Sequence, residues 1–235
     1  MLEDIPDIVN VADDILILGR GTSQEQAEAA HDRVVHAFMK RIQSAGLRLN
    51  PTKIRFKVTQ AVFMGHLVTR DGLKPDPSKV SAVADLEAPT DKEGVRRILG
   101  VMTYLAKFCP QLSTISKPLR DLLRQDSAFI WAPQHDEALT HFKRLATSAP
   151  CLRYFDVEAP VVLQVDASDY GLGAALLQPR TGRDMPPDPE LQPVAFASSS
   201  LTPTEQNYAQ IEKECLAIVE GFEKLAKIGP CVSVF

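Results

Sequence analysis

Residues 10–18 of this 235-residue chain read Asn-Val-Ala-Asp-Asp-Ile-Leu-Ile-Leu, preceded by Ile8 and Val9. Two short apolar runs flank an acidic pair, Asp13 and Asp14, and this order predicts a strand, a tight turn and a second strand. Burying a carboxylate is costly unless a cation or hydrogen bonds replace its water. The pair therefore fits two alternatives equally well: a solvated hairpin tip, or a site for a divalent metal ion.

The composition is typical of a globular protein, with 45% hydrophobic and 24% charged residues. No apolar run approaches the roughly 18 residues that a membrane span needs. Glu3 and Asp4 stand where a secretory signal would carry positive charge. We therefore expect an intracellular protein, in the cytoplasm or nucleus, that is not secreted and has no membrane partner.

The net charge of −4 hides two basic segments. Residues 33–57 contain seven Lys or Arg and no Asp or Glu, and residues 91–124 contain seven bases and three acids. This asymmetry favours a polyanion as the partner. A solvated helix face is the alternative explanation for each segment.

The pattern after the hairpin predicts a long helix and then a small sheet. Ser23 and Gln26 form a capping box, and apolar residues recur at helical spacing up to Gly46. Short alternating apolar pieces then predict strands over residues 47–68. Prolines 75, 77 and 89 indicate a linker.

The remaining pattern predicts a helical middle third followed by a second α/β segment. Helices are expected over residues 95–108, around 119–123 and around 138–145. A strand is expected over 161–165, then a turn between Gly171 and Gly173, then an exposed proline-rich loop over 179–193. A final helix carries one apolar stripe, made of Ile211, Cys215, Ile218, Phe222 and Leu225.

Two constellations could carry function. Arg96, Gly100 and Tyr104 share one face of the helix expected at 95–108. Glycine inside a helix costs about 1 kcal/mol relative to alanine, which either a close nucleic-acid backbone or close helix packing would explain. Asp166, at a strand end, and Glu214, beside the final apolar stripe, could together bind Mg²⁺. Taken alone, either residue is more often a surface acid or a cap.

Seven motifs in order closely resemble the polymerase polyprotein of gypsy-type LTR retrotransposons, over roughly residues 8–225. They are NVADDILI (10–17), LNPTK (49–53), FMGHLV (63–68), PDPSKV (75–80), ILGVMTYL (98–105), VDASDYGLGA (165–174) and NYAQIEKECLA (207–217). The resemblance implies an RNA-directed DNA polymerase with ribonuclease H. It also implies three segments: the C-terminal part of a reverse-transcriptase palm (1–73), a thumb with connecting helices (74–150), and the N-terminal part of an RNase H-like domain (151–235).

The resemblance also implies a role for each matched residue. Asp13 and Asp14 would bind two Mg²⁺ ions that act on the primer and a nucleotide triphosphate, and Asp166 and Glu214 would bind metal in an RNase H site. The residues implied in nucleic-acid binding are Lys53 near the nucleotide, Met64, Gly65 and His66 in a hairpin that grips the primer, and Arg96, Gly100 and Tyr104 along the minor groove of the template–primer duplex.

Departures from the family pattern shape the functional expectation. Val11 replaces a tyrosine, and we expect the upstream palm aspartate, the fingers and the later RNase H acids to be missing from a chain truncated at both ends. The expected fold is mixed α+β, with Ile211, Ile218 and Phe222 left partly exposed. The expected function is a nucleic-acid-binding polymerase fragment that is not catalytic alone, with a second polypeptide as a candidate to complete it. The alternatives are a non-catalytic binding module and a residual retroelement product without activity.

Overall fold

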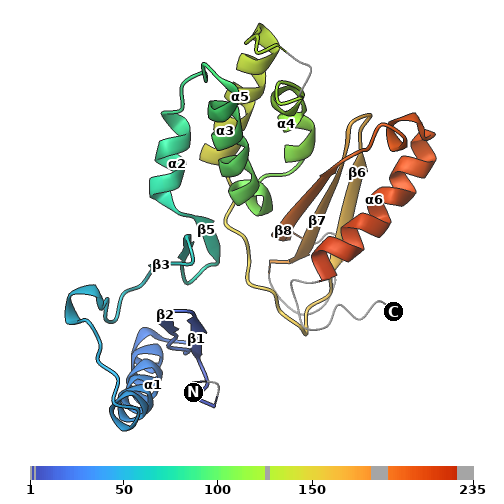
Figure 1. Cartoon of the computed structure of the whole chain (residues 1–235). Coiled ribbons are helices and arrows are strands. Elements are labelled where there is room, and N and C mark those ends of the chain that lie inside the picture. The colour runs from blue at the N-terminus through green and yellow to red at the C-terminus, as the bar shows by residue number, and fades with distance from the viewer. Residues whose placement is uncertain (1, 3, 125–127, 181–189, 227–235) are drawn as a thin grey trace. The chain divides into compact units, whose positions relative to one another are not determined.

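The computed structural model describes residues 2, 4–124, 128–180 and 190–226 (Figure 1). The chain divides into two compact units, Met1–Arg70 and Asp71–Phe235. Helices and strands both contribute, which confirms the predicted mixed fold class. Among the described residues, no helix has both the length and the apolar content that crossing a membrane requires.

The first unit begins with the predicted hairpin. β1 (Ile8–Val11) and β2 (Asp14–Ile17) are antiparallel, and α1 (Gln24–Ser44) follows them. Ser23 Oγ accepts a hydrogen bond from the Gln26 N–H at 3.2 Å, so half of the predicted capping box forms. The Gln26 side chain accepts from Thr22 instead of from the Ser23 N–H, at 3.2 Å from its backbone nitrogen and 2.7 Å from its hydroxyl.

A small apolar cluster holds this hairpin against α1. Phe38 and Ile42, one turn apart on α1, are buried together with Leu2 and Ile5. The partly buried residues that pack around them come from the hairpin, from α1 and from the segment after it: Ile8, Ile15, Ile17, Val34 and Leu49. The helical spacing of apolar residues in the sequence thus produces the packing that fixes the acidic turn in place.

The strands predicted over residues 47–58 do not form. This stretch contains only a 3₁₀ turn, η1 (Pro51–Lys53), and the strands begin later, at β3 (Ala61–Phe63) and β4 (His66–Val68). Residues 54–58 lie beside α1, where Lys57 Nζ is 2.8 Å from Asp32 Oδ2 and the Phe56 ring meets the His31 ring edge-on. The alternation therefore has no partner strand, and Phe56 remains 55% exposed.

The second unit begins with β5 (Leu73–Pro75) and four helices: α2 (Pro77–Ala84), α3 (Lys92–Leu105), α4 (Leu112–Asp121) and α5 (Pro133–Thr147). The linker predicted around the prolines is wrong. Asp76 caps α2 by accepting the Ser78 N–H at 2.9 Å, and Pro77 occupies the first turn, where a missing N–H is tolerated. α4 also begins earlier than predicted and contains Pro118.

These helices share one core. α3 contributes Val95, Ile98, Met102 and Leu105, all at most 3% exposed. Other fully buried members of this core come from the helices around α3: Val83, Phe108, Leu119 and Phe142. Because one side of α3 is buried in this core, its opposite side faces solvent.

The second unit ends in an antiparallel sheet with the order β6-β7-β8 and the helix α6 (Gln210–Leu225). The strands are β6 (Val162–Ala167), β7 (Gly171–Pro179) and β8 (Leu191–Ser200). Gly171 and Gly173 lie within β7, so the turn precedes them, contrary to the prediction. Pro193 lies within β8 at a shift of register, and the middle of the predicted proline-rich loop lies outside the described residues.

α6 covers one face of this sheet (Figure 1). A Cβ at Gly221 would lie 3.1 Å from Ala174 Cβ and 3.3 Å from Val165 Cγ1, so glycine allows close approach. The residues that α6 buries are Lys213, Ala217, Gly221 and Leu225.

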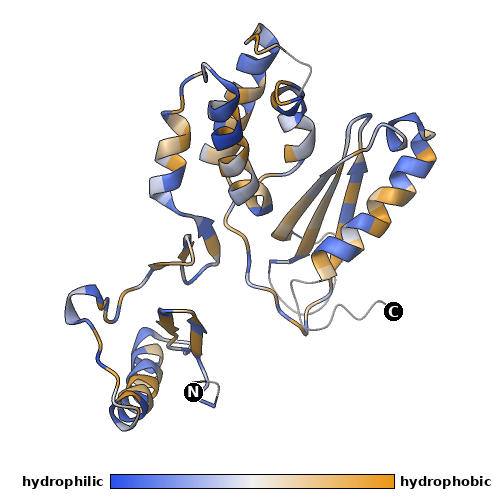
Figure 2. Cartoon of the chain, in the orientation of Figure 1, coloured by the Kyte–Doolittle hydropathy of each residue, from blue (hydrophilic) through white to orange (hydrophobic). Residues whose placement is uncertain are grey.

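Most of the predicted apolar stripe therefore faces away from the sheet. Ile211 is 66% exposed, Ile218 44% and Phe222 36%, which confirms the expected exposure of these three side chains. Apolar residues accordingly continue along α6 beyond the buried line (Figure 2).

Candidate nucleic-acid interface and acidic sites

Asp13 and Asp14 lie at the solvent-exposed end of the β1–β2 hairpin. Val11 pairs with Asp14, and Ala12 takes a left-handed conformation with φ of 50°. The Asn10 side chain donates to the Ala12 carbonyl at 3.2 Å, which steadies the turn. Sequence reasoning did not assign this bracing role to Asn10, although its place two residues before a left-handed position was a usable signal.

The acidic pair fits a magnesium ion in donor type. Its oxygens are hard ligands, they face solvent, and Mg²⁺ characteristically takes one or two carboxylates while keeping waters or substrate phosphates. Across the part of the chain that the structure describes, no three His, Cys, Asp or Glu side chains gather into a candidate metal group. A metal ion held by Asp13 and Asp14 would take its remaining ligands from outside the described residues, such as water or a phosphate-bearing substrate.

The hairpin predicted to grip a primer forms between β3 and β4. Met64 and Gly65 make its two-residue turn, both with positive φ, at 50° and 73°. The His66 ring nitrogen Nδ1 lies 2.7 Å from the Met64 carbonyl oxygen. Positive φ at a non-glycine residue is strained, and Met64 is also 48% exposed. The turn thus presents a large apolar side chain to solvent.

Lys53 ends the 3₁₀ turn η1 and is exposed. Asn50 orders this turn, because its side chain accepts the Thr52 N–H at 3.0 Å and the Thr52 hydroxyl at 2.8 Å. The sequence Asn-Pro-Thr-Lys therefore builds a short rigid support that carries a cation at its end.

Arg96 and Gly100 lie on the side of α3 that faces away from the core, with Tyr104 at its edge. A Cβ built on Gly100 would meet no atom within 4 Å. Close helix packing, one of the two explanations for this glycine, is therefore excluded for the described residues. Arg96 pairs with Glu93 at 3.1 Å and retains 58% side-chain exposure. Tyr104 is half-buried, and burial raises the pKa of its phenol.

Asp166 and Glu214 are exposed on separate elements, β6 and α6. Val165 and Ala167 pack in the cluster that contains Ala217 of α6, so strand alternation directs Asp166 to the opposite face of the sheet. There Gln111 Nε2 donates to Asp166 Oδ2 at 2.8 Å. Sequence reasoning missed this partner, which comes from 55 residues upstream.

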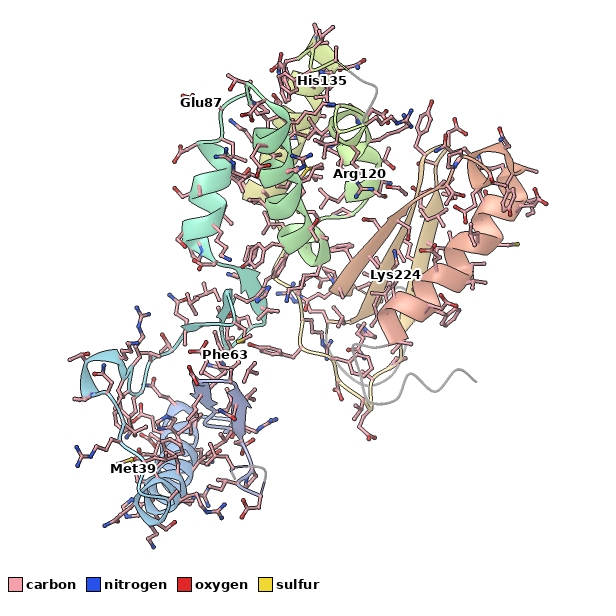
Figure 3. The ribbon with its side chains drawn as sticks, viewed as in Figure 1. Met39, Phe63, Glu87, Arg120, His135 and Lys224 are labelled. Atoms are coloured by element: carbon pink, nitrogen blue, oxygen red, sulfur yellow. The ribbon has the colours of Figure 1, made fainter. Side chains whose placement is uncertain are left out.

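The turn between β6 and β7 is anchored from both neighbouring helices. Thr114 of α4 and Ser168 have their hydroxyl oxygens 3.1 Å apart, and Lys213 of α6 has its Nζ 3.3 Å from Asp169 Oδ1. Lys213 is only 4% exposed. Arg120, labelled in Figure 3, also reaches from α4 to the sheet and donates to the Ser200 hydroxyl. The geometry around Asp166 is therefore built by α4 and α6 together.

Comparison with known proteins gives consistent results. Residues 131–228 match the family model of the RNase H-like domain found in reverse transcriptase. The Tf2-3 and Tf2-7 transposon polyproteins of Schizosaccharomyces pombe are each 30% identical to the chain over 216 residues, which is 92% of this chain and 15% of each polyprotein. The chain thus spans about one seventh of the length of these relatives.

Two solved structures show the same fold. A foamy viral protease-reverse transcriptase in complex with double-stranded DNA has a TM-score of 0.79 and 22% identity, covering 97% of this chain and 45% of that chain. The corresponding protein in complex with an RNA/DNA hybrid has a TM-score of 0.78 and 22% identity, covering 97% of this chain and 29% of that chain. Residues 131–228 thus resemble the RNase H-like domain found in reverse transcriptase, and the chain as a whole is similar to one segment of the Tf2 retrotransposon polyproteins.

Proposed function

We propose that this chain binds the template–primer duplex of a gypsy-type retrotransposon RNA-directed DNA polymerase through the exposed side of α3. The observation that carries the proposal is Gly100, a helix-interior glycine at which an added Cβ would meet no atom of the described residues within 4 Å. A glycine that destabilises its helix by about 1 kcal/mol and serves no internal packing is explained by an external backbone that comes close. Arg96 and Tyr104, one turn to either side, supply a cation and an aromatic ring for that ligand.

The remaining assignments extend the proposal to the other candidate residues. In it, residues 1–73 are palm, 74–150 thumb with connecting helices, and 151–235 RNase H-like. Lys53 and the hairpin turn at Met64, Gly65 and His66 contact the nucleotide and the primer end.

The metal sites of the proposal rest on two pairs of carboxylates. Asp13 and Asp14 hold Mg²⁺ beside a nucleotide triphosphate. Asp166 and Glu214 each supply one carboxylate to a ribonuclease H metal site, and because Asp166 points to the sheet face opposite α6, this site also needs ligands from elsewhere to bring the metal between them. When bound, Mg²⁺ supplies the positive charge that neutralises phosphate oxygens.

The proposed function is duplex binding without catalysis by this chain alone. Two-metal chemistry on phosphates needs enough converging carboxylates to hold both ions. The described residues contain candidate carboxylates in pairs and no group of three possible ligands. The complexes of the foamy viral relatives with double-stranded DNA and with an RNA/DNA hybrid support the binding half of the proposal. A second polypeptide that supplies further ligands is the proposed route to activity.

Fluorescence anisotropy with a labelled RNA/DNA hybrid tests this function. We expect the full chain to bind with an affinity that falls as salt rises, because phosphate contacts release counterions. Arg96→Ala and Lys53→Ala should each weaken binding and lower the salt slope. Arg144→Ala is the matched control, since Arg144 is an exposed arginine on α5. Unchanged binding when both Arg96 and Lys53 are replaced would refute the proposal.

A further inference from the structure

The segment Pro-Asp-Pro-Ser-Lys-Val at 75–80 has so far no function in the proposed interface. It forms the start of α2, with Asp76 as its cap. Lys79, in the first turn, places its Nζ 3.9 Å from the centre of the Tyr104 ring. An ammonium group over an aromatic face at this distance is a favourable cation–π contact. α2 therefore delivers a cation to the end of the α3 side that carries Arg96 and Gly100.

The charge of Lys79 is available to an outside ligand. Lys79 is exposed, and no ion pair found among the described residues includes it. Arg96, by contrast, already has Glu93 at 3.1 Å. The half-buried Tyr104 ring lies beneath the Lys79 ammonium group, 3.9 Å from its centre to Nζ, and so fixes where that charge stands. Lys79 thus combines a fixed position with a charge that no ion pair found among the described residues neutralises.

The spacing suits the wide minor groove of an A-form duplex and is too large for the narrow minor groove of B-form DNA. Arg96 and Tyr104 are eight residues apart, which corresponds to about 12 Å along the helix axis at 1.5 Å per residue. A B-form minor groove is about 6 Å wide, and that of an A-form duplex is wide and shallow. With Gly100 over the centre of the groove, Arg96 and Lys79 would stand over its two phosphate-lined rims.

We propose that Lys79 binds a backbone phosphate of the duplex on the groove rim opposite Arg96, with Tyr104 as the residue that positions it. This inference rests on the proposed function of α3 and adds a residue from a different helix. Among the cation–π pairs of the described residues, Lys79 is the only cation that lies over the Tyr104 ring. The inference gives this cation a function.

The test measures hybrid binding by the full chain over a range of salt concentrations. One lost phosphate contact should reduce the salt slope by about 0.9, which at about 0.1 M salt corresponds to roughly an eightfold loss of affinity. Lys79→Ala is expected to show this loss. Lys74→Ala is the matched control, because Lys74 is an exposed lysine five residues away that takes part in none of the cation–π pairs of the described residues. Lys79→Gln serves as the second variant, and thermal unfolding verifies that each protein is folded.

The outcomes separate this inference from the proposed function. A smaller salt slope for Lys79→Ala and Lys79→Gln, with Lys74→Ala like the parent, supports Lys79 as a phosphate-binding residue. If Arg96→Ala weakens binding while both Lys79 variants behave like Lys74→Ala, the inference is overturned and the proposed function stands. If the unmodified chain does not bind the hybrid, both fall.

Discussion

Replacing Gly100 by alanine should stabilise the chain and weaken its binding to duplex at the same time. An alanine Cβ would meet no atom within 4 Å, so helix propensity alone sets the change in stability. Alanine is favoured over glycine by about 1 kcal/mol inside a helix, which raises the melting temperature by roughly 2–4 °C for a unit of this size. The added methyl group stands where we propose that the nucleic-acid backbone approaches.

A larger side chain should separate the two effects further. We expect Gly100→Leu to lose at least about tenfold in affinity for an RNA/DNA hybrid, or about 1.4 kcal/mol, while remaining folded. Thermal unfolding and fluorescence anisotropy measure the two quantities. Thr140→Leu is the matched control, because it adds similar apolar bulk to an exposed position of α5 in the same unit. A lower melting temperature for Gly100→Ala, or unchanged affinity for Gly100→Leu, would refute the reasoning.

Three further predictions concern catalysis, thiol reactivity and pH. The chain alone should give no Mg²⁺-dependent primer extension on a primed RNA template above a protein-free control, and robust synthesis would contradict this. Burial raises the pKa of Cys109 to about 11, so iodoacetamide at about pH 8 should label the exposed Cys215 and spare Cys109 until the protein unfolds, as mass spectrometry can determine. The hydrogen bond from Arg41 lowers the pKa of Asp4 below 3.8, so the stability that Asp4 contributes should be present above that pH and lost as pH falls through the lowered value. Urea unfolding should therefore show wild type and Asp4→Asn converging in acid; a constant difference would contradict the ion pair.

Local sequence signals predicted much of the fold correctly. The hairpin around Asp13 and the helices α1 and α3 follow from apolar spacing and capping residues alone, because these signals act within a few turns of chain. Where such signals were overlooked, the prediction failed. Asp76 and Pro77 together are a helix start, yet three prolines in the region were taken to indicate a linker.

Other failures had no local signal that could have prevented them. The alternating residues 54–58 look like a strand, but a strand requires a partner, and here the segment lies beside α1 instead. The apolar stripe of α6 was identified correctly as a stripe, yet the sheet packs against the neighbouring line of Lys213, Ala217 and Gly221. Small residues allow the helix axis to approach the strands closely, which bulky residues such as Phe222 would prevent.

The features of the candidate site also fall into two groups: those that local sequence predicted and those that only the tertiary structure determined. The residue types and their spacing determined the acidic pair, the shared face of Arg96, Gly100 and Tyr104, and the resemblance to a retrotransposon polymerase, since each depends on neighbours in sequence. Only the tertiary structure decided what surrounds them.

Lys79 stands over Tyr104 and Gln111 binds Asp166 through contacts between elements, and Gly100 faces open solvent because no other described element packs there. The contact between Gln111 and Asp166 joins residues 55 positions apart. Such contacts arise from the way buried faces of separate helices and strands pack into one core, and no local pattern of residues encodes them.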